Sequence, residues 1–116
     1  MKVWRDKDGE EFRNSKTCWG REYKPDTCKI DVSKISVRGK FPESGWGYNE
    51  EAHEVAVVVA GKGSIEKQGG EKKELAMGDV IHFAPMERVR WEGDLDLIIA
   101  CGPAFDRNKH HIEEDL

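Results

Sequence analysis

Long apolar runs are missing from this chain. The longest, from Val55 to Ala60, falls far short of the roughly 20 residues that a membrane-spanning helix needs. No apolar segment follows the charged opening residues either. The sequence therefore predicts neither a secretory signal peptide nor a membrane partner.

Cysteine is scarce, and its pattern argues against a fold built on disulfides. Cys18, Cys28 and Cys101 are odd in number and widely spaced. This pattern fits reduced thiols in a cytoplasmic protein better than a disulfide framework or a zinc site. A Cys18–Cys28 bridge is the alternative.

Clusters of basic side chains are absent as well. The 116 residues include 19 Lys and Arg against 23 Asp and Glu, which gives a formal net charge of -4. The adjacent Lys72 and Lys73 are flanked by Glu71 and Glu74, a pattern typical of a solvated turn. Binding to nucleic acid without sequence preference needs a clustered basic surface, so we expect no nucleic-acid partner.

What the chain does contain is a series of short strand patterns separated by turns. Apolar residues nearly alternate from Cys28 to Val37, and apolar or β-branched residues fill the runs 54–60, 80–84 and 95–101. Glycine and proline punctuate these runs, and no helical pattern of ten or more residues appears. This rhythm predicts an all-β sandwich or barrel with a single core.

Three segments follow from this pattern. We expect residues 1–27 to form an N-terminal arm that packs on the barrel, with at most one short strand. Residues 28–105 should form the domain itself. Residues 106–116, which include His110 and His111, should form a polar, flexible tail.

Two motifs within residues 45–93 resemble those of the cupin family. The first cupin motif ends in a glutamate that is followed, after six residues, by a glycine, as Glu54 and Gly61 are here. The second opens with a Gly-Asp turn, apolar residues and a proline, as the segment from Gly78 to Pro85 does. The resemblance implies a small single-domain cupin of the RmlC-like kind. Its fold would be the double-stranded β-helix, a jelly-roll barrel.

The histidines that bind metal in this family are missing from their positions. Depending on the spacing used, the three positions hold Tyr48 or Gly47, Glu50 or Asn49, and Val89 or Arg90. Only Glu54 remains of the usual three histidines and one glutamate. We therefore expect no cofactor and no tightly bound transition metal. At most, Glu50, Glu54 and His82 would hold a divalent metal weakly.

Six polar residues near the motifs are candidates for ligand binding: Tyr48, Glu50, Glu54, His82, Arg88 and Arg90. Strand alternation places Glu54 on the inner face of its strand. A carboxylate there is costly unless it is paired, so Glu54 either binds a ligand or pairs with Arg88 or Arg90. The two arginines share a face. Pointing inward they would bind an anion, and pointing outward they would be solvated while Trp91 fills the core.

Three functional hypotheses remain open. The first is a cupin that binds a small polar or anionic ligand in its barrel. The second is a cupin enzyme of the isomerase, lyase or oxygenase class that acts on a sugar or small organic acid. Glu54 and Glu50 would then serve in acid–base catalysis or metal binding. The third is a structural or interaction module whose barrel is filled by side chains.

A second copy of the chain is the partner that the strand at 54–60 suggests. Its outward face shows Val55, Val57 and Val59, where a half-solvated antiparallel strand would carry polar residues. An exposed apolar patch of this kind marks an interface. Either the N-terminal arm or a second subunit covers it, and we expect a homodimer.

Overall fold

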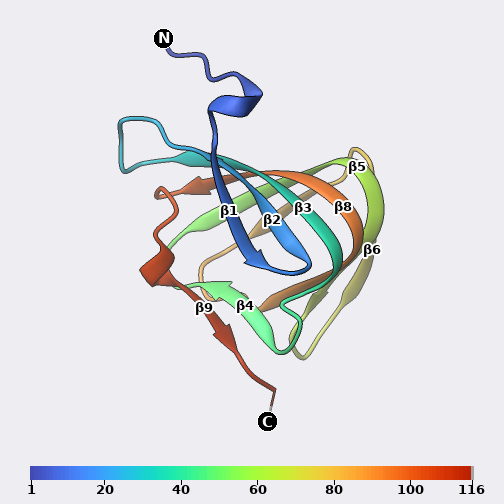
Figure 1. Cartoon of the computed structure of the whole chain (residues 1–116). Helices are drawn as coiled ribbons and strands as arrows, with labels where there is room; N and C mark the ends of the chain where they lie inside the picture. The colour runs from blue at the N-terminus through green and yellow to red at the C-terminus, as the bar shows by residue number, and fades with distance from the viewer. Residues whose placement is uncertain (116) are drawn as a thin grey trace.

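The computed structural model describes residues 1–115 and consists almost entirely of antiparallel strands (Figure 1). The elements follow in the order η1 (Asp6–Asp8), β1 (Glu10–Ser15), β2 (Cys18–Tyr23), β3 (Asp31–Phe41), β4 (Trp46–Asn49), β5 (His53–Lys67), β6 (Lys72–Ala76), β7 (Val80–Phe83), β8 (Val89–Gly102), η2 (Arg107–Lys109) and β9 (His110–Glu113). The all-β prediction is confirmed. In the described part of the chain, no helix is long and apolar enough to cross a membrane.

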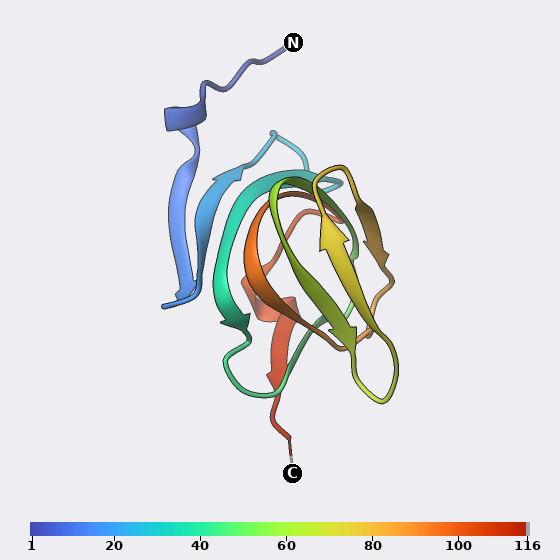
Figure 2. The same ribbon diagram turned by 90° about the vertical axis from the view of Figure 1, so that its right-hand side faces the viewer.

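Strand β8 organises the barrel because long strands pair along both of its edges. On one edge, residues 91–101 pair with the whole of β3. On the other, residues 89–102 pair with the whole of β5. Each half of β5 then takes a further partner, β7 at residues 54–57 and β6 at residues 62–66. The sheet therefore curls over on itself, as Figure 2 shows.

Two glycines allow this curl. The register of β5 against β8 shifts between Val58 and Ala60, and Gly61 follows with a φ of 84°. A Cβ atom at Gly61 would collide with the carbonyl oxygen of Asp94 on β8. Gly93, with a φ of 124°, lies directly opposite Gly63. Without side chains at these points, the two strands can bend together at close approach.

The core fills one end of the barrel with the inward residues of three strands. Val37 of β3, Val58 of β5, and Leu95 and Leu97 of β8 are each exposed by 1% or less. Burial of such a side chain contributes about 1.5–3 kcal/mol. The period-two alternation predicted for β5 is observed as far as Val58, and the register shift before Ala60 interrupts it.

The first 27 residues hold more strand than we expected. Strands β1 and β2 form a hairpin, and β2 pairs with residues 32–37 of β3, so the hairpin extends the sheet. The turn η1 is attached to it, since the Tyr23 hydroxyl donates a hydrogen bond to the Asp6 carbonyl at 2.6 Å. Trp4 packs edge-on against the Tyr23 ring.

The C-terminal segment is likewise ordered where a flexible tail was expected. After η2, strand β9 pairs antiparallel with β4, from Asn49 opposite His110 to Trp46 opposite Glu113. The two termini leave from opposite ends of the molecule (Figures 1 and 2). All three cysteines carry free thiols, with Cys18 and Cys101 buried and Cys28 exposed.

Candidate functional site

A cavity of about 190 Å³ lies inside the barrel, between β2, β3, β8 and the segment that leads into β9. A smaller space of about 50 Å³ continues toward β4 and β7. Five residues line both: Phe41, Glu54, Trp91, Ile99 and His110. The two spaces are thus parts of one lumen, and side chains do not fill the barrel completely.

The outer face of the sheet carries a larger depression of about 1000 Å³. Its charged side chains form ion pairs with one another: Arg21 with Glu11, Lys34 with Asp6, and Arg38 with Asp96. Exposed pairs of this kind contribute little and remain solvated. The lumen, where a carboxylate lies among apolar walls, is therefore the stronger candidate site.

Three polar side chains lie side by side at one end of the lumen. Asp31 of β3 pairs with Cys101 of β8, and Cys101 pairs with Glu54 of β5. Directly paired residues of neighbouring antiparallel strands point to the same face, so all three side chains form one row. Asp31 is only 1% exposed, and its Oδ1 atom has no hydrogen-bond partner among the described residues.

This row changes the acidity of Glu54. Burial, and then the negative charge of Asp31, raise the pKa of Glu54 to about 7, while the Cys101 thiol acts weakly in the opposite direction. The alternative in which Arg88 or Arg90 pairs with Glu54 is not observed, because these arginines pair with Glu113 and Glu66. Glu54 forms no ion pair with a cation among residues 1–115, so its carboxyl can both give and take a proton near neutral pH.

Cys101 is a hydrogen-bonding residue rather than a reactive one. Burial, followed by the charges of Glu54 and Asp31, raises its pKa to about 12. The thiol therefore keeps its proton and donates to the carbonyl oxygen of Pro103 at 3.3 Å. A thiol in this state is neither a nucleophile nor a metal ligand.

His110 is a lumen residue that the sequence did not indicate. It begins β9 and packs against the ring of Phe105 at 5.9 Å between ring centroids. Burial, and then the neighbouring His111, lower its pKa, so the ring is neutral at neutral pH. A neutral imidazole in the same lumen as Glu54 supplies a second group for proton transfer.

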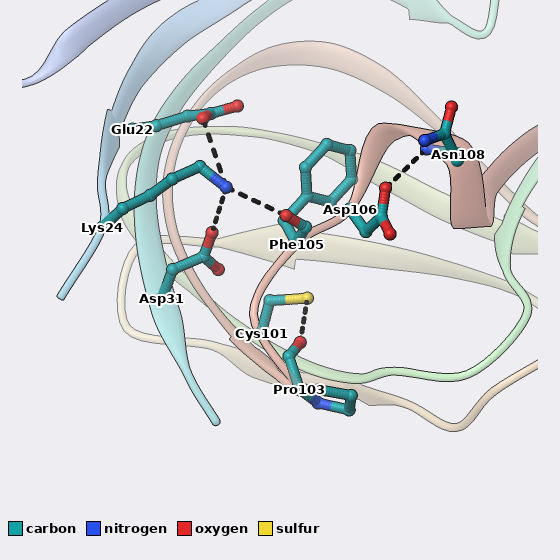
Figure 3. A network of polar contacts seen from close by, with 8 residues as sticks. All are labelled: Glu22, Lys24, Asp31, Cys101, Pro103, Phe105, Asp106 and Asn108. Carbon is teal, nitrogen blue, oxygen red and sulfur yellow. Dashed lines mark hydrogen bonds and ion pairs between the residues drawn. The ribbon is translucent and has the colours of Figure 1, made fainter. Parts of the chain in front are cut away.

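Lys24 joins three segments of the chain near the polar row (Figure 3). Its ammonium group donates to Asp31 Oδ2 at 3.3 Å and to the Phe105 carbonyl at 2.9 Å, and lies 3.7 Å from Glu22. This contact fastens the end of β2 to the segment that carries His110. The Asp106 side chain then accepts from the Asn108 backbone N–H at 2.9 Å and begins η2.

Of the six candidate residues, Glu54 places its side chain in the lumen, whereas Tyr48 borders the lumen and turns its ring outward, toward Arg88 and His111. Glu50 is exposed and pairs with Lys109 at 3.2 Å and His111 at 3.1 Å. These contacts, that of Lys109 first, lower the pKa of Glu50. Glu50 is thus a surface ion pair, and the structure does not bring it into the row with Glu54.

The two arginines lie outside the barrel, because Val89 and Trp91 take the inward positions of β8. The Arg88 guanidinium stacks over Tyr48 at 4.0 Å, and that of Arg90 stacks over Trp46 at 4.0 Å. His82 also faces outward, where its ring contacts His53. Neither arginine nor His82 faces the cavity around Glu54.

The donor atoms of the lumen do not fit the metal centre of three histidines and one glutamate. Glu54 is present, but Val89 is apolar and His110 reaches the lumen from a different element. Among residues 1–115, no three His, Cys, Asp or Glu side chains come together as a metal site. We therefore derive no chemical step through a metal ion.

A single domain with a curled antiparallel sheet and a polar row inside it defines a small cupin. The sequence model of the EutQ-like cupin domain matches residues 35–96, over half of the chain, and the chain belongs to this family. The family prediction and the jelly-roll fold are confirmed. A search of curated proteins found no match.

Solved structures with the same fold include several enzymes. The nucleoside dehydratase Pac13 of Streptomyces, also solved with uridine, has a TM-score of 0.85 at 18% identity over 100% of this chain and 93% of its own. Ectoine synthase from P. lautus has a TM-score of 0.77 at 13% identity, covering 100% and 93%. KdgF from Halomonas sp. has a TM-score of 0.74 at 18% identity, covering 91% and 96%. At these identities the likeness establishes the fold alone.

Proposed function

We propose that this cupin binds a small, neutral, hydroxylated molecule in its lumen and transfers protons on it, with Glu54 as the acid–base residue. The observation that carries this proposal is the pKa of Glu54, raised to about 7 inside a cavity that can hold a ligand. A catalytic acid or base works best when its pKa lies near the operating pH. A residue perturbed in this way within a cavity is a candidate for function.

The charge of the lumen favours a neutral ligand over an anionic one. The inward carboxylates Asp31, Glu54 and Glu22 outnumber the two cations near the cavity, Lys24, which pairs with Asp31 and Glu22, and the exposed Arg107. Hydroxyl groups can donate to these carboxylates, whereas a further negative charge beside them is unfavourable. The cavity of about 190 Å³ corresponds to roughly six water molecules at about 30 Å³ each, which suits a small metabolite.

The aromatic walls support the same ligand class. Phe41, Trp91 and Phe105 surround the polar row, so one side of the ligand would be covered by rings. A sugar or nucleoside has both apolar ring faces and hydroxyl groups. The dehydratase among the structural neighbours, which was solved with uridine, shows that this fold accommodates such a molecule.

The reaction that fits best is an elimination or isomerisation, which belongs to the lyase or isomerase alternatives. Neutral His110 would accept a proton from a carbon beside the leaving group. Protonated Glu54 would give its proton to the departing hydroxyl, which leaves as water while the electron pair of the C–H bond forms the new double bond. The oxygenase alternative lacks a fitting donor set for iron.

The test compares two carboxylates, one inside the lumen and one outside. Uridine and ribose are the first probes, added separately to isotope-labelled protein, with amide shifts followed by NMR and product by chromatography. We expect shifts at lumen residues, binding that survives in Glu54→Gln, and loss of product in Glu54→Gln but not in Glu50→Gln. Product formation that depends on Glu50 instead, or probes that shift only surface residues, would refute the proposal.

We also propose that a second copy covers the outer face of β5. Val55 and Val59 are 40% and 42% exposed, and the β1–β2 hairpin lies on the other side of β3 and β8. The arm of the same chain therefore does not cover them. A C2 pair of these faces would bury the valines against each other.

A further inference from the structure

His53 and His82 form a pair on the outer face of the barrel. His53 Nδ1 lies 2.9 Å from His82 Nε2, and the ring planes are within 8° of parallel. Their neighbours Glu54 and Phe83 point into the lumen, so strand alternation turns both histidines outward. Both rings are exposed. Among residues 1–115, each of the two side chains forms a hydrogen bond only with the other.

The two rings are arranged for an N–H···N hydrogen bond. The ring centroids are 5.2 Å apart, so the two facing nitrogens lie between the ring centres. One ring must donate its N–H and the other must accept, since neutral imidazole has one donor and one acceptor. Two ring nitrogens are thus held close together by two paired strands, β5 and β7.

We propose that His53 and His82 together bind a divalent late transition-metal ion. Metal–nitrogen bonds in proteins are about 2.0–2.1 Å, so two such nitrogens at right angles on one ion are about 2.9 Å apart. The observed separation already has this value. Rotation of two exposed rings is enough to turn their lone pairs toward an ion, provided that each ring carries its remaining proton on its other nitrogen.

The donor set indicates which ions would bind. Two imidazoles at adjacent positions suit the tetragonal geometry of Cu²⁺ and Ni²⁺. Affinity for nitrogen ligands rises to Cu²⁺ and falls again at Zn²⁺. No third His, Cys, Asp or Glu among residues 1–115 joins the pair, so water completes the coordination and the ion exchanges readily. Protons compete for the same lone pairs, so acid weakens binding.

This site is separate from the lumen. The metal of the cupin fold is held inside the barrel, whereas this pair lies on the opposite face of β5 from Glu54. The pair lies beside Val55 on the face that the proposed dimer would cover. It is independent of the proposed proton transfer, because no residue of that chemistry takes part in it. Loss of metal binding would leave the lumen chemistry untouched.

The experiment titrates Ni²⁺ into the full chain carrying Cys28→Ser, which removes the exposed thiol as a competing ligand. Calorimetry gives stoichiometry, and the paramagnetic broadening of NMR signals locates the ion. We expect one Ni²⁺ per chain, with broadening centred on β5 and β7, and at least a tenfold loss of affinity in His53→Ala and in His82→Ala.

The matched control is His111→Ala, which removes another half-exposed histidine with its own contact, to Glu50. This variant should bind Ni²⁺ as the parent does. His82→Asn provides a second, milder substitution if an alanine variant fails to fold. The proposal is overturned if no Ni²⁺ binds, if His111→Ala removes binding, or if the His53 and His82 variants bind unchanged.

Discussion

The pKa of Glu54 is raised first by burial and is then modified by two neighbours that come from far along the chain. Asp31 lies on β3 and Cys101 on β8, and sheet register alone puts them beside it. The negative charge of Asp31 adds to burial in raising the pKa of Glu54. The pKa of Glu54 therefore depends on its neighbours in the row, and a substitution at Asp31 should change it.

Replacement of Asp31 by Asn should lower the pKa of Glu54. The variant removes the nearby negative charge and leaves Glu22 as the one carboxylate paired with Lys24 among residues 1–115, and both effects favour the ionised carboxyl of Glu54. A carbon-13 NMR titration of the Glu54 carboxyl measures the change directly. Glu50→Gln, on the surface, should leave the Glu54 titration where it was. An unchanged pKa in Asp31→Asn would show that burial alone sets it.

The raised pKa also predicts how stability depends on pH. In the unfolded chain Glu54 titrates near 4.5, and in the folded protein near 7, so the folded state holds more protons in between. Stability should fall as pH rises from 4.5 through 7, by up to about 3 kcal/mol from this group, and then level off.

Replacement of Glu54 by Gln should remove this dependence. The variant should match the parent in urea denaturation at pH 5 and exceed its free energy of unfolding at pH 8. Glu74→Gln, at an exposed position, provides the control. Its free energy of unfolding should fall with rising pH as that of the parent does. Equal declines in parent and Glu54→Gln would mean that Glu54 is not the titrating group.

At the scale of one residue, the sequence predicted the inward position of Glu54 because a period of two is a local property. It did not predict the positions of Glu50 and His82, because the face of a residue depends on where its strand begins. His110 gave no signal at all, since its place in the lumen depends on the pairing of β9 with β4.

At the scale of strands, the bend of β5 depends on Gly61. Replacement of Gly61 by Ala should destabilise the protein by more than the roughly 1–2 kcal/mol that a left-handed backbone costs, because the new Cβ meets the Asp94 carbonyl. Gly69 has a similar φ of 72° but open space around it, so Gly69→Ala should show the conformational cost alone. Urea denaturation of both variants gives the difference. Equal losses of stability in the two variants would show that the close contact between β5 and β8 at Gly61 does not require glycine.

The strands that the sequence predicted are those with apolar, β-branched runs, namely parts of β3, β5, β7 and β8. The strands that it missed include β4, β9 and one strand of the β1–β2 hairpin, all of them short. Their pairing partners stabilise them: β2 lies against β3, and β9 lies against β4 about 60 positions earlier. A pattern of side chains cannot reveal a strand whose stability comes from backbone hydrogen bonds to a distant segment.

At the scale of the whole molecule, the exposed valines of β5 predict the oligomeric state. We expect light scattering at micromolar concentration to give the mass of a dimer, and Val59→Asp to give a monomer, because a charge in the interface would be buried without a partner. Val3→Asp, at an exposed position near the N-terminus, should remain dimeric. A monomeric mass for the parent protein would contradict the proposal that a second copy covers these valines.

The central place of β8 also sets the order of events during folding. β3 and β5 have no direct pairing with each other and meet only through β8, which ends at Gly102. On the ribosome, both strands must therefore wait, with one edge unpaired, until β8 has been synthesised. Contacts between such distant segments close slowly. The barrel should accordingly close only after β8 has left the ribosome.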